Sequence, residues 1–165
     1  MKKDIWNDEV MKIIYGADFV AKQRQFEKSE YNAAICCAKK TIRYFKKNNI
    51  KDGLIYIQKI ADSSDKINFL DEKQEVYNAR IIIEKVRRSL YKRRKIPGKC
   101  LEASMAYAAA LAKLGFKFDL IVGQHLFLSN KYRFHAWIEV EKQCVNDKRY
   151  SNTDITKIVF KRRFE

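Results

Sequence analysis

Hydrophobic residues recur every three or four positions through the first half of the chain, and this spacing predicts a series of amphipathic helices. Residues 5–15 and 29–47 show it most clearly. Residues 54–60 are so evenly apolar that they fit either a helix or a strand, and the neighbouring helices favour a helix. The polar residues 63–65 then predict a loop.

A further helix is predicted to begin at Asp71. Its carboxylate suits the first backbone amides of a helix, and Gln74 follows three residues later, as in a capping box. One apolar stripe runs along the rest of this helix. We expect it to pack on the core, and its members are Val76, Ala79, Ile83, Val86 and Leu90.

The pattern changes after Pro97 and Gly98. An alanine-rich helix is predicted from about Lys99 to Leu114, with Gly115 as its C-terminal cap. Shorter apolar runs bounded by turn residues then predict strands over 116–123, 133–140, 143–146 and 158–160. Helices followed by a small antiparallel sheet make an α+β protein. We divide it into a helical N-terminal region, residues 1–85, and a core, residues 86–165, with one compact unit as the alternative.

The composition is that of a packed protein without a membrane span. Hydrophobic residues make up 47% of the 165 positions, and one proline and five glycines argue against long disordered linkers. No apolar run reaches the length of a bilayer, and the N-terminus has no apolar export signal. We therefore expect a cytoplasmic protein with no membrane partner.

The cysteines argue against a metal site. Cys36 and Cys37 are adjacent, no CxxC pair occurs, and both histidines lie far from these cysteines in the sequence. We therefore expect no metal and no cofactor. Cys36, Cys37 and Cys144 are interpreted as small, buried or half-buried apolar residues.

The net charge of +15 predicts an acidic partner surface, which a nucleic acid, an anionic protein or peptide, or a membrane surface would provide. The basic residues are scattered over several short clusters, and no nucleic-acid motif accompanies them. Specific nucleic-acid binding is therefore the lesser expectation, and solvated surfaces account for most of the charge.

Three residues form a candidate set for covalent catalysis: Cys100, His135 and Asp147. Cys100 lies at the start of the alanine-rich helix, where free backbone amides and the helix dipole favour the thiolate. His135 follows on a strand as the candidate base, and Asp147 follows on the returning strand as the residue that would orient the imidazole.

The pairing of Asp147 with His135 depends on the register of the hairpin between their strands. A two-residue turn at Lys142 and Gln143 would place Asp147 opposite Ile138, on the wrong face. A three-residue loop over 140–142 would place it opposite His135. Glu139 lies on the same face of the strand as His135 and is the alternative orienting residue.

Several blocks together resemble the transglutaminase-like (papain-like) fold, and more narrowly the leader peptidases of lasso-peptide biosynthesis. The blocks are Pro97 to Ser104, Gly115, Leu120 to Gly123, His135 to Val140, and Asn146-Asp147. The resemblance covers about residues 86–150. It implies that the core is a catalytic core and that the protein is a cysteine peptidase. Such an enzyme cleaves a ribosomally made precursor between its leader and core peptides.

The resemblance also assigns roles and partners. Cys100 would attack the scissile carbonyl, His135 would transfer the proton, and Asp147 would hold the imidazole. Phe127, Tyr132 and Trp137 are candidates for lining the substrate cleft, and packing on the helical region is the alternative for Phe127 and Tyr132. The chain is too short to hold the family's leader-recognition domain. This implies a split form that works with the precursor leader peptide, a separate small leader-recognition protein and a lasso cyclase.

Two alternatives remain open at this stage. The first is a non-catalytic basic module that binds nucleic acid or an acidic protein. The second keeps the acyl-enzyme but passes the acyl group to an amine instead of water.

Overall fold

A computed structural model describes residues 24–47, 49–92, 100–125, 134–146 and 156–165. The described helices are α3 (Lys28–Lys47), α4 (Ile50–Asp62), α5 (Glu72–Lys92) and α6 (Cys100–Lys113). The strands are β1 (Phe118–His125), β2 (Phe134–Val140), β3 (Gln143–Cys144) and β4 (Thr156–Phe164). The helix expected over 5–15 lies outside the described residues.

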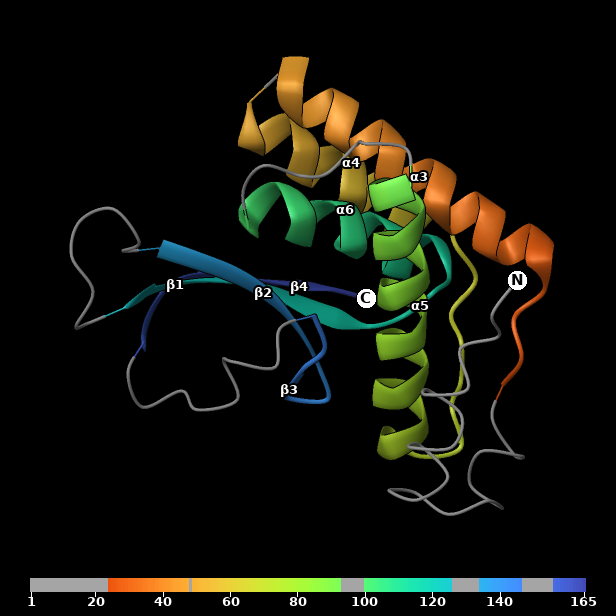
Figure 1. The fold of residues 1–165 in the computed structure, drawn as a ribbon. Helices are drawn as coiled ribbons and strands as arrows, with labels where there is room; N and C mark the ends of the chain where they lie inside the picture. Colours follow the sequence, from red (N-terminus) through yellow and green to blue (C-terminus); the bar gives the residue numbers. More distant parts are fainter. Residues whose placement is uncertain (1–23, 48, 93–99, 126–133, 147–155) are drawn as a thin grey trace.

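The elements pack in layers around α6 (Figure 1). Helices α3 and α4 lie on one side of α6, the sheet lies on the other side, and α5 stands beside both. All six alanines of α6 except Ala103 are buried, and α3 is its most extensive neighbour. Alanine side chains let helices and strands approach closely, which explains why so apolar a helix fits between two layers.

The helix boundaries follow the capping signals of the sequence. Asn49 caps α4 by accepting a hydrogen bond from the Asp52 amide at 2.9 Å. Asp71 Oδ1 accepts from the Gln74 amide at 2.7 Å, and Gln74 Oε1 accepts from the Leu70 amide at 3.1 Å. The capping box expected at the start of α5 is therefore present, except that the Gln74 side chain bonds the amide of Leu70 instead of that of Asp71.

Gly115 ends α6 in the left-handed region, with φ 76°. The Phe116 amide donates to the Leu111 carbonyl and the Gly115 amide donates to the Ala112 carbonyl, the two bonds of a Schellman motif. The Gly115 carbonyl in turn accepts from the Ile67 amide at 3.2 Å. This motif uses Phe116, so β1 begins at Phe118 and not at the predicted residue 116.

The four described strands form one antiparallel sheet in the order β3-β2-β1-β4. The last strand, β4, therefore pairs with β1 on the side away from β2, and a bulge at Val159 shifts the register between Val122 and Gly123. Sheet and helices together confirm the predicted α+β class.

One hydrophobic cluster joins the helices to the sheet, with members from α3, α4, α5, α6, β1, β2 and β4. The predicted stripe of α5 is buried in it. The division at residues 85 and 86 falls within α5, and it stays a prediction. Among the described helices, none is both long and apolar enough to cross a membrane.

Candidate active site

Cys100 is the first residue of α6, as the sequence predicts. Its half-buried Sγ lies 3.9 Å from the carbonyl oxygen of Phe134, the first residue of β2. The start of α6 therefore meets the start of β2, beside His135. The chain brings the candidate nucleophile and the backbone that carries the candidate base into contact across 34 positions.

The four cysteines are all free thiols. Cys37 and Cys144 are half-buried as expected, and burial raises the pKa of the Cys37 thiol. Cys36 is exposed, so its interpretation as a packed residue was wrong. It lies on the face of α3 that is turned to solvent, where Asn32 and Lys40, four residues before and after it, are also exposed.

His135 is half-buried on β2, and its Nε2 atom is buried. Its ring stacks on that of Trp137, with ring centroids 6.2 Å apart and ring planes 14° from parallel. The residue opposite His135 on β1 is Gly123, which has no side chain to compete for the space beside the imidazole. The indole of Trp137 thus packs along the imidazole ring of His135.

Trp137 is only 2% exposed, and its Nε1 donates a hydrogen bond to Glu139 Oε1 at 2.8 Å. His135, Trp137 and Glu139 alternate along β2 and so share one face of the sheet. Four residues of strand separate the Cα atoms of His135 and Glu139 by about 13 Å. Glu139 therefore accepts from the indole of Trp137, and its role as the alternative orienting residue for His135 stays a prediction.

Asn146 joins the end of the β2–β3 hairpin to both β2 and α6. Its Oδ1 accepts from the Ile138 amide of β2 at 2.8 Å, and its Nδ2 donates to Ser104 Oγ of α6 at 3.1 Å. Ser104 Oγ donates in turn to the Ala136 carbonyl at 2.9 Å. These bonds fix α6 against β2 within one helical turn of Cys100.

Two arginines of α5 complete this support. Arg87 Nη2 donates to the Asn146 carbonyl at 2.8 Å, and Arg80 Nη2 donates to the Cys144 carbonyl at 3.3 Å. Arg87 also forms an ion pair with Glu84 at 3.4 Å. These two arginines therefore use part of the positive charge of the chain to bind the backbone carbonyls of Cys144 and Asn146.

The hairpin between β2 and β3 has neither of the two registers considered above. Val140 pairs with Gln143, and the turn is Glu141-Lys142, with φ of 47° and 60°. Positive φ at both turn residues is the geometry of a type I′ turn. The paired strand ends at Cys144. The Val145 amide still donates to the Ile138 carbonyl at 3.0 Å, and the Asn146 side chain takes the place of a main-chain acceptor for the Ile138 amide. Asp147 lies outside the described residues, as do Phe127 and Tyr132, so their predicted roles stay predictions.

The same face carries a buried carboxylate at its far end. Asp119 is 5% exposed, and its Oδ2 lies 3.2 Å from Lys161 Nζ and 3.5 Å from Arg163 Nη1. Over the described parts of the chain, no three His, Cys, Asp or Glu side chains gather as metal ligands would.

Sequence reasoning missed Ser104 and Asn146 as parts of the site's framework. The available signal was a serine within an alanine run and an asparagine at the end of an apolar strand. Each is a hydrogen-bonding group at a position where a nonpolar side chain would otherwise pack.

The comparison with protein families matches residues 61–160 to the Transglutaminase-like superfamily. The match covers more than half of the chain, and the described fold is the α+β arrangement that the resemblance implies. The chain therefore belongs to the transglutaminase-like superfamily, whose members are typically cysteine-dependent enzymes. Neither the curated proteins nor the solved structures gave a significant match.

Proposed function

We propose that this protein is a cysteine peptidase that removes the leader from a ribosomally made precursor during lasso-peptide maturation. The observation that supports the proposal is the contact between Cys100 Sγ and the carbonyl oxygen of Phe134, the residue that precedes His135 in the sequence. Family membership supports the cysteine chemistry, and the resemblance of the sequence supplies the substrate.

The proposed reaction has two steps. The Cys100 thiolate attacks the scissile carbonyl carbon, and the oxyanion forms near the free backbone amides of the first turn of α6. The bond from carbon to nitrogen then breaks, and His135 gives the amine the proton that it took from the Cys100 thiol; this amine is the new N-terminus of the core peptide. Asp147 would hold the imidazole in this step.

In the second step, water attacks the thioester and gives its proton to His135. The bond from carbon to sulfur breaks, the leader leaves with a free carboxylate, and the thiol is restored. We propose that a separate leader-recognition protein delivers the precursor and that a cyclase closes the released core peptide.

The test is cleavage of the precursor by the full chain with its leader-recognition protein present, followed by mass spectrometry. We expect Cys100→Ala and His135→Ala to lose cleavage and keep the helical circular dichroism of the native protein. Cys36→Ala removes an exposed thiol on α3 and should cleave normally. Full cleavage by Cys100→Ala would refute the proposal, and a leader mass that includes an added amine would indicate acyl transfer instead of hydrolysis.

A further inference from the structure

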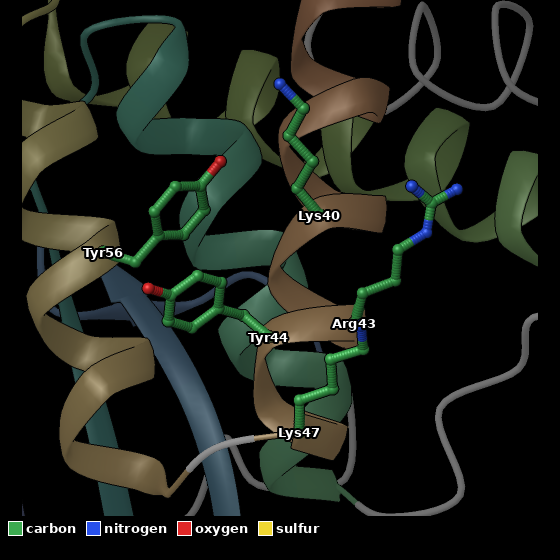
Figure 2. Close-up of a pocket in the computed structure, with 5 residues that line it drawn as sticks. All are labelled: Lys40, Arg43, Tyr44, Lys47 and Tyr56. Atoms are coloured by element: carbon green, nitrogen blue, oxygen red, sulfur yellow. The ribbon is translucent and has the colours of Figure 1, made fainter.

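A groove of about 410 Å³ lies between α3 and α4. It is formed by three basic and two aromatic side chains: Lys40, Arg43, Tyr44, Lys47 and Tyr56. The cations all come from α3, and the tyrosine rings lie face to face between the two helices (Figure 2). Their centroids are 5.3 Å apart and their planes differ by 7°.

The cations form a row along one face of α3. Lys40, Arg43 and Lys47 are spaced i, i+3 and i+7, so they span about 10.5 Å of helix axis. Within the described ranges, no carboxylate forms an ion pair with any of the three. Other cations of the chain are used internally, as Lys161 and Arg163 are by Asp119. As far as the described residues go, the charge of this row is therefore left for an external anion.

The groove also offers apolar contact. Tyr44, which lines the groove, is 42% exposed; α4 also exposes Ile50 at 46% and Ile55 at 40%, outside the lining of the groove. An exposed aromatic ring beside an arginine is typical of surfaces that bind proteins. Burial raises the pKa of the Tyr56 phenol, so its hydroxyl stays a hydrogen-bond donor at neutral pH.

We infer that the groove between α3 and α4 docks an acidic, amphipathic segment of a partner protein. Carboxylates spaced over two helical turns would match the row from Lys40 to Lys47, and neighbouring apolar residues would cover Tyr44 and α4. A nucleic acid fits less well, because three cations over about 10.5 Å of helix axis would contact few phosphates. The inference goes beyond the proposed function and does not depend on peptidase activity.

The test is fluorescence anisotropy with a labelled synthetic helix that carries glutamates at i, i+3 and i+7 and leucines beside them. A peptide with glutamine in place of glutamate and a single-stranded oligonucleotide serve as comparison probes. We expect Lys40→Glu/Arg43→Glu to weaken binding of the acidic peptide by about tenfold or more. Lys28→Glu/Lys73→Glu changes the net charge equally at exposed positions and should weaken it less than about twofold.

Tyr44→Ala separates apolar contact from charge. It should weaken binding of the acidic peptide and leave the salt dependence of that binding unchanged. Absence of peptide binding by the native protein at low salt would overturn the inference. So would equal losses in the two charge variants, which would indicate unspecific attraction. Tighter binding of the oligonucleotide, lost through the same α3 variant, would assign the groove to nucleic acid instead.

Discussion

Asn146 Nδ2 donates a hydrogen bond to Ser104 Oγ at 3.1 Å and so joins the end of the β2–β3 hairpin to the middle of α6. The two residues are 42 positions apart. The same asparagine accepts from the Ile138 amide, so one side chain holds the sheet against the helix that begins with Cys100. The residue after it in the sequence is Asp147.

Asn146→Ala should lower the free energy of unfolding by about 1–3 kcal/mol, because it leaves the Ile138 amide without its acceptor. Urea unfolding measures the change. Gln143→Ala removes an exposed amide from the same hairpin and should change stability by less than about 0.5 kcal/mol. Equal stability of the two variants would show that the Asn146 bonds contribute nothing net.

Trp137 both stacks on His135 and donates to Glu139, and two variants separate these contacts. Trp137→Phe keeps a ring beside the imidazole but loses the donor, so we expect a loss of about 1 kcal/mol. Trp137→Leu loses the ring as well, and about 3 kcal/mol is expected. Thermal unfolding gives the order, and identical losses would mean that stacking on His135 adds no stability.

Gly115→Ala should destabilise the protein by about 2 kcal/mol or more. Its positive φ disfavours any side chain, and a Cβ atom there would overlap the Asp65 carbonyl, which is backbone and cannot move aside. Gly53→Ala is the comparison, because its Cβ would meet only the end of the flexible Met105 side chain. Chemical denaturation should leave Gly53→Ala within about 1 kcal/mol of the native protein, since alanine favours helix. A smaller loss at Gly115 than at Gly53 would contradict this account.

Burial raises the pKa of the Glu75 carboxyl above its ordinary value of 4.5, and the nearby Glu141 carboxylate raises it further. Proton uptake by Glu75 therefore stabilises the fold fully below pH 4.5, and this contribution is lost as the pH rises through the folded pKa. Glu75→Gln should raise the melting temperature at pH 7 by about 1–2 °C, the effect of about 0.5 kcal/mol in a protein of this size. The gain should vanish at pH 4.

Glu72→Gln on the same helix should change the melting temperature in the opposite direction. Glu72 is exposed in the first turn of α5, where a negative charge is favourable, so its removal should lower the melting temperature at pH 7. A fall for both variants at neutral pH would refute the assignment of Glu75 as a destabilising charge.

Features set by neighbouring residues could be predicted from the sequence. The helical spacing, the capping side chain of Asp71 and the cap at Gly115 depend on contacts within a few positions, and the structure has them where the pattern indicates. The pattern of residues 54–60 fitted a helix and a strand equally. The prediction of a helix, made from the neighbouring helices, is confirmed by α4.

Features set by distant pairing could not be predicted. The hairpin turns at Glu141-Lys142, which contains neither glycine nor asparagine, so the residues that usually indicate positive φ were absent. The position of β4 beside β1 is fixed by contacts across the sheet, and no local signal specifies it. The bonds of Asn146 likewise involve residues 8 and 42 positions away.

The burial of α6 between two layers limits how far the chain can be shortened. The family match begins at residue 61, yet α3 covers one side of α6, and Arg162 near the C-terminus donates to Gln58 of α4. A fragment of residues 61–160 would present an alanine surface to water and lose Phe164, which stacks on Phe118. Cys100 would then begin a helix with only one of its two supports, so the residues that define the family would not suffice to hold its nucleophile.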